Sequence, residues 1–141
     1  MDSAVQTGGR SQAVDRETLA LGVGDVVLLA GLILVGQLSH NVNPIEQPLA
    51  SLETVAPFVI GWLVIAAIAG TYTRDVASSV TRAARQITVT WIAAANVGLI
   101  LRTALFGETA APPFPLVITG FGLLLLVGWR VGYAAYASRT R

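Results

Sequence analysis

The fold is decided by residues 18–39, which read TLALGVGDVVLLAGLILVGQLS. A single charged residue, Asp25, interrupts this apolar run. An α-helix needs about 20 apolar residues to cross the hydrocarbon core of a bilayer, whereas a secretory signal peptide has an apolar core of about 7–15 residues and then a small-residue cleavage site. The stretch is long and lacks such a site, so it predicts a retained transmembrane helix.

Three more apolar stretches of similar length follow. The predicted spans are 18–39, 55–73, 86–106 and 114–136. Turn-forming residues separate them, and we expect Pro57 in the first turn of the second span, where its missing N–H matters least. The sequence predicts an all-α polytopic membrane protein with four transmembrane helices in an up-down bundle. The membrane domain covers 18–137, between a disordered cytoplasmic tail at 1–17 and a cytoplasmic tail at 138–141.

The composition supports the same class and excludes others. Hydrophobic residues make up 54% of the 141-residue chain and charged residues 12%, whereas about a quarter of a soluble domain is charged. The chain has no cysteine, which excludes thiolate metal sites and disulfides, and its single histidine, His40, excludes a bis-histidine haem within one chain. A net charge of +1 argues against a nucleic-acid partner. We expect no cofactor, no metal site, and the lipid bilayer as a partner.

The arginine residues predict the orientation, because cytoplasmic loops carry the excess of basic residues. They lie near both termini and in the central connection, at Arg10, Arg16, Arg74, Arg82, Arg85, Arg139 and Arg141. The connections at 41–54 and 107–113 contain none. We therefore predict an N-in/C-in bundle in the cell membrane, with these two connections outside.

The central connection is amphipathic. Its apolar residues, Val76, Val80, Ala83 and Ile87, share one helical face, and the arginines lie off that face. The pattern fits either a cytoplasmic amphipathic turn or the start of the third helix.

Two charges lie at matching depth inside the predicted spans. Counting at ~1.5 Å per residue places both Asp25 and Arg130 roughly 21–23 Å from the outer ends of the first and fourth spans. A charge in hydrocarbon needs a partner, a water path or an escape to the interface. The sequence predicts an Asp25–Arg130 ion pair. Three interpretations stay open: a static clamp, an Arg130 that extends to the headgroups beside an unpaired Asp25, and a proton or ion relay.

A second polar pair, Arg102 and His40, is expected at the outer mouth of the bundle. Arg102 lies about one turn below the outer end of the third span, near the depth of His40. Three roles stay open for its guanidinium. It could bind lipid phosphates at the outer surface, or form a salt bridge with Glu46, Glu53 or Glu108. Together with His40 it could instead form a site for an anion or carboxylate.

Other residues point to helix packing. Asn96, in the middle of the third span, predicts an interhelical hydrogen bond. Trp91 and Trp129 fit an interfacial aromatic belt or the lining of a cavity near Asp25. Small residues spaced by four, at Ala66/Gly70, Ala94/Gly98 and Gly128/Gly132, favour close helix contact in a compact bundle or a homodimer.

The chain resembles the DUF3054 family of small prokaryotic membrane proteins, over about residues 19–131. The resemblance rests on Gly98-Leu-Ile-Leu-Arg102, Gly107, Thr109-Ala110, Pro113-Phe114, Gly128-Trp129-Arg130, Asp25, Ser39-His40 and Pro57-Phe58 with Gly61-Trp62. The chain departs from the family pattern at Gln37, because members commonly have a basic residue just before the Ser-His pair. The resemblance implies a four-span membrane fold and adds no activity.

Three function classes stay open. The chain contains no nucleophile–base set, phosphate-binding glycine loop or HExxH motif, which argues against an enzyme. We expect a non-enzymatic accessory or structural membrane component, which predicts a tightly packed core and a polar or notched outer face, with a membrane protein as partner. The alternatives are a small transporter with a cavity that reaches Asp25, and an enzyme acting on lipid at the outer surface.

Overall fold

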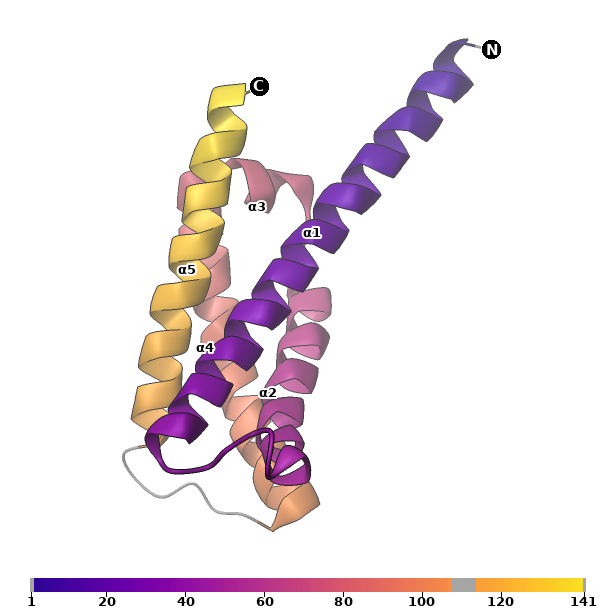
Figure 1. Ribbon diagram of the computed structural model, residues 1–141. Coiled ribbons are helices and arrows are strands. Elements are labelled where there is room, and N and C mark those ends of the chain that lie inside the picture. Colours follow the sequence, from indigo (N-terminus) through magenta and orange to yellow (C-terminus); the bar gives the residue numbers. More distant parts are fainter. Residues whose placement is uncertain (1, 108–113, 141) are drawn as a thin grey trace.

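Apolar sequence and few helix breakers give long helices. The computed structural model describes residues 2–107 and 114–140 (Figure 1). Its helices are α1 (Asp2–Ser39), α2 (Pro48–Ala69), α3 (Arg74–Ser78), α4 (Val80–Phe106) and α5 (Phe114–Thr140), and this part of the chain contains no strand. Four segments are long and apolar enough to cross a membrane: Arg16–Ser39, Pro48–Ala69, Val80–Phe106 and Pro115–Thr140. The chain is a multi-pass membrane protein, and the predicted all-α fold is confirmed.

The four long helices form a bundle in which each contacts two neighbours. α2 and α4 pack most extensively, α4 also packs on α5, and α1 lies against α2 and α5. Figure 1 shows α1 crossing the bundle obliquely, with both termini and α3 at one end. We call this end the termini end, and the opposite end, where the α1–α2 loop lies, the loop end.

The helix boundaries differ from the predicted spans at the start of α1 and of α2. α1 begins at Asp2, so helix covers the residues predicted as a tail; no proline interrupts them, and each added residue extends a formed helix by one hydrogen bond. α2 begins at Pro48, so Pro57 lies inside the helix and not in its first turn. The N–H of Ile45 donates to Asn43 Oδ1 at 2.9 Å in a turn of the preceding loop, and Pro48 lies in the first turn of α2, where a missing N–H matters least.

The end of α2 determines where the following residues lie. Gly70 adopts a left-handed conformation with φ 69°, and the N–H of Thr71 donates to the carbonyl of Ala66 at 3.0 Å. This Schellman arrangement ends the helix before residue 73 and turns the chain back toward the bundle. After α3, Ser79 caps α4 by accepting a hydrogen bond from the N–H of Arg82, so the amphipathic connection is both a short helix and the first turns of α4.

The core depends on close contact between α2 and α4. A Cβ at Gly98 would lie 2.5 Å from Cδ1 of Phe58, and one at Gly61 would lie 2.9 Å from the carbonyl oxygen of Ala94. The rings of Trp62 and Trp91 meet at 6.4 Å between centroids and 51° between planes. Of the predicted small-residue pairs, Ala94 and Gly98 therefore lie in a helix interface, whereas Cβ atoms at Gly128 and Gly132 would meet open space.

Candidate functional site

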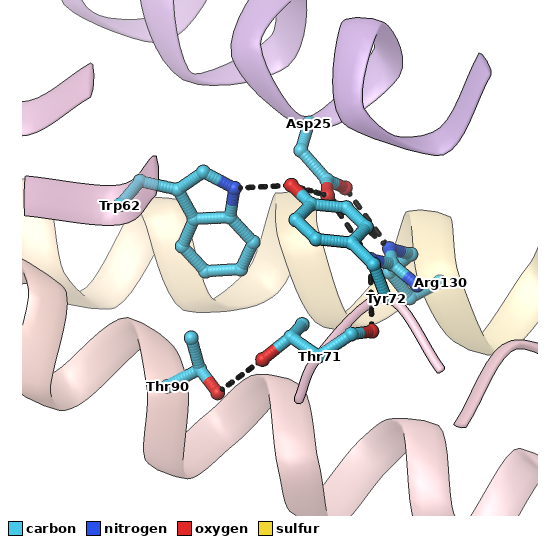
Figure 2. Close-up of polar contacts among 6 residues, drawn as sticks. All are labelled: Asp25, Trp62, Thr71, Tyr72, Thr90 and Arg130. Carbon is cyan, nitrogen blue, oxygen red and sulfur yellow. Dashed lines mark hydrogen bonds and ion pairs between the residues drawn. The ribbon is translucent and has the colours of Figure 1, made fainter. Parts of the chain in front are cut away.

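Asp25 and Arg130 form an ion pair in the interior of the bundle (Figure 2). Arg130 Nε lies 3.1 Å from Oδ1 of Asp25, and Arg130 Nη2 lies 3.1 Å from Oδ2, which is the two-pronged geometry that holds a guanidinium on a carboxylate. The Asp25 residue is 0% exposed and Arg130 1% exposed. The guanidinium therefore does not extend to the headgroups.

Helix periodicity brings both residues to the interior. Buried residues recur at every fourth position of α1, at Leu21, Asp25, Leu29, Ile33 and Gln37. The same spacing occurs on α5, at Ile118, Gly122, Leu126, Arg130 and Ala134. Residues spaced by four form one ridge of a helix, so each charge belongs to the ridge that its helix packs into the bundle.

Tyr72 and Trp62 extend the ion pair toward α2. The hydroxyl of Tyr72 donates to Oδ2 of Asp25 at 2.8 Å and accepts a hydrogen bond from Nε1 of Trp62, also at 2.8 Å. Cζ of Arg130 lies 5.0 Å from the centroid of the Tyr72 ring, within the range of a cation–π contact. The tyrosine therefore contacts both charges of the pair.

Thr71 links the network to α4. Its carbonyl accepts a hydrogen bond from Nη2 of Arg130 at 3.3 Å, and its hydroxyl lies 2.9 Å from that of Thr90. The six residues in Figure 2, which we call the interior network, thus join all four spanning helices and the turn after α2. The sequence alone did not predict four members of this network: Thr71, Tyr72, Trp62 and Thr90. The glycine that precedes Thr71 and Tyr72 was an available signal, because a glycine often ends a helix and redirects the chain that follows it.

The interior network has little capacity for a further ligand. The Nη1 atom of Arg130 is buried and has no hydrogen-bond partner among the described residues, so its two N–H groups are the donors that remain. An apolar groove between α1 and α2 has Tyr72 in its wall, but neither Asp25 nor Arg130 lines it. The carboxylate and the rest of the guanidinium are occupied by protein groups, as in a structural ion pair.

Arg102 and His40 line one pocket at the loop end of the bundle. The cavity has a volume of about 280 Å³ and also contacts Gln37 of α1 and the apolar side chains of Leu32, Ile33 and Ile118. Glu108, a predicted partner of Arg102, lies outside the described residues, and neither Glu46 nor Glu53 lines the pocket. The structure therefore brings the two predicted polar residues to the same cavity.

Asn96 faces outward, and the two tryptophans differ in burial. Asn96 is exposed and its Nδ2 donates to the carbonyl of Ile92 in the same helix at 2.7 Å, so it makes no bond to another helix within the described part of the bundle. Trp91 is buried in the hydrophobic core and donates from Nε1 to the carbonyl of Thr119 at 2.8 Å, rather than lining a cavity. Trp129 is half-buried and packs against Gly24 and the ring of Tyr133.

Comparisons with known proteins give one match. No curated protein and no solved structure matches the chain. The family model described as "Protein of unknown function (DUF3054)" matches residues 22–133, which include both charges of the ion pair and both His40 and Arg102 of the loop-end pocket. The chain belongs to the DUF3054 family.

Proposed function

We propose that this protein is a non-enzymatic accessory component of the cell membrane, which binds a second membrane protein through the outer face of α4 around Asn96. The exposed amide of Asn96 is the observation that carries the proposal. Counting at ~1.5 Å per residue, Asn96 lies about 24 Å from the start of α4 and about 15 Å from its end. It therefore lies at the depth of hydrocarbon.

An amide on a lipid-facing surface lacks the hydrogen bonds that water would supply. The bond to the carbonyl of Ile92 uses one N–H of Asn96. A second N–H and the carbonyl oxygen remain, with no partner among the residues that the structure describes. Its exposed neighbours on α4, Val89, Ile92 and Ile100, are apolar, so a partner helix could pack there and hydrogen-bond to the amide.

The packed interior supports an accessory role over transport. A carrier needs a polar group that exchanges between partners and a path that leads to it. In the interior network, Asp25 is instead hydrogen-bonded to Arg130 and Tyr72. Neither charged residue is more than 1% exposed. A packed core and a polar outer face are the two properties expected of an accessory subunit.

Site-specific photocrosslinking in native membranes tests the proposal. A photoreactive residue at Ile100, beside Asn96 on the exposed face, should give an adduct with one membrane protein of defined mass. Asn96→Leu should lower the yield by about threefold to fifteenfold, the range expected for one interhelical hydrogen bond. Thr103→Val removes a hydroxyl that bonds within α4 and should leave the yield unchanged. A photoreactive residue at Leu124, exposed on α5, is the control position.

Two results would contradict the accessory role. Adducts with lipid only would show that no helix covers Asn96. An adduct of the chain with a second copy of itself would assign the face to a homodimer.

A further inference from the structure

The loop-end pocket combines an apolar wall with a polar mouth. Leu32, Ile33 and Ile118 contribute aliphatic side chains from α1 and α5. Gln37 lies farther along α1 than Leu32, about 7 Å nearer the loop end at ~1.5 Å per residue. The cavity therefore runs from polar groups near the end of the bundle into the depth of the hydrocarbon.

The described residues at the mouth carry positive charge. Of the described residues that line the cavity, Arg102 alone has a permanent charge and none is a carboxylate, and His40 adds an imidazole. A guanidinium can keep one partner and still donate to another ligand, because it carries five N–H groups in a planar fork. This set fits a carboxylate or a phosphate.

Gln37 adds an independent sign of a ligand. It is 9% exposed, and its Oε1 is buried with no hydrogen-bond partner in the described part of the chain. A buried polar group without a partner costs free energy unless a ligand or water supplies the missing bond. The amide Nε2 can donate to a carboxylate or phosphate at the mouth, whereas Oε1 accepts and takes a donor such as a water molecule or a hydroxyl.

We propose that the loop-end pocket binds an anionic single-chain amphiphile, with its carboxylate or phosphate on Arg102 and His40 and its acyl chain along Leu32, Ile33 and Ile118. The volume of about 280 Å³ is near the lower limit of small-molecule pockets, which suits one chain better than two. The amphiphile could come from a free fatty acid or from one chain of an anionic phospholipid. The proposal is independent of the partner proposed for Asn96.

Binding of radiolabelled dodecanoate to the full chain in phosphatidylcholine nanodiscs tests the proposal, with empty nanodiscs as the background. We expect saturable binding of one molecule per chain. Arg102→Gln should weaken it by about tenfold or more, because charge-assisted hydrogen bonds are the strong ones. Arg85→Gln removes an arginine that does not line this pocket and should leave the affinity unchanged.

A second pair of variants tests the cavity without changing charge. Gly36 lines the pocket, and a Cβ there would meet no atom within 4 Å, so a side chain can start at this position, and Gly36→Leu should fill the cavity and abolish binding. Gly31 is equally open but does not line the pocket, so Gly31→Leu is the matched control and should bind normally. Circular dichroism and size-exclusion profiles check that both variants fold.

Competitors identify the source of the amphiphile. Displacement of dodecanoate by phosphatidylglycerol in the disc would assign a phospholipid chain, and displacement only by free fatty acids would assign the free acid; both results support the pocket. Equal affinity in wild type and Arg102→Gln, normal binding in Gly36→Leu, or equal competition by butanoate, which has the head without the chain, would overturn the proposal.

Discussion

Asp25 and Arg130 are each costly in the interior and are stable there only together. A buried charge without its partner is strongly destabilising, whereas replacing both charges by apolar groups is often neutral or stabilising. The pair is buried almost completely, so water cannot replace a lost partner. A static clamp therefore predicts a large loss of stability when one of the two charges is removed, whereas a relay does not.

We predict that Asp25→Asn will destabilise the bundle by about 3–5 kcal/mol, because Arg130 remains buried without a counter-charge. Thermal and denaturant unfolding in micelles would measure the loss. The double variant Asp25→Leu/Arg130→Leu should recover most of the stability. A relay predicts the opposite for the single variant, so wild-type stability of Asp25→Asn would contradict the clamp.

Tyr72→Phe should cost about 1–3 kcal/mol, because it removes the hydroxyl that donates to Asp25 and leaves Nε1 of Trp62 without its acceptor. The ring and its contact with Arg130 remain. The same unfolding measurement tests this prediction, with Tyr136→Phe as the control because Tyr136 is exposed. Equal losses in both variants would count against the role of Tyr72 in the network.

At the scale of elements, helix ends and glycine contacts decide the architecture. The left-handed Gly70 ends α2 and places Thr71 and Tyr72 where they reach Arg130 and Asp25. Along the helix bodies, Gly98 lets α4 approach Phe58 of α2 within a distance that no side chain would allow. The interior network depends on both the turn at Gly70 and the close contact at Gly98, because each fixes the position of α2.

Gly98→Ala should destabilise the bundle by about 1–3 kcal/mol, the usual cost of overpacking a core. Its new Cβ would lie 2.5 Å from Cδ1 of Phe58 and 3.1 Å from the Phe58 Cα, so backbone as well as side chain must move. Gly120→Ala adds the same methyl group in open space and should have little effect or stabilise α5. Denaturation of the two variants side by side would test the contact.

At the scale of the whole molecule, the two ends of the bundle have different characters. The termini and α3 lie together at one end (Figure 1), and the pocket lined by Arg102 and His40 lies toward the other end. The termini end carries the arginines of the central connection and of the C-terminal helix end. The proposed orientation places that end in the cytoplasm.

Cysteine accessibility in intact cells tests this orientation, and the chain has no native cysteine to interfere. Ser39→Cys, at the loop end, should react with a membrane-impermeant maleimide. Thr81→Cys and Thr140→Cys, at the termini end, should react only after the membrane is opened. The reverse pattern would invert the orientation and place the loop-end pocket inside.

The sequence predicted well how deep each polar residue lies along its helix, but it predicted poorly the direction in which the side chain faces. Counting residues placed Asp25 and Arg130 at one level, and the structure has them in contact. The same counting placed Asn96 in mid-span but could not say that it faces outward, and it did not find Tyr72 as a partner of Asp25. Depth follows from the rise per residue, whereas direction depends on which face each helix packs.

The sequence by itself determined the four spans, their all-α structure and the need for an internal partner for Asp25, because hydrocarbon forces backbone groups into helices and makes a lone charge costly. Only the tertiary structure decided that the chain turns inward at Gly70 after α2, that Asn96 faces outward, and that Gln37, His40 and Arg102 share one cavity. These depend on how each helix is rotated about its axis, which is set by side-chain contacts between helices far apart in the chain.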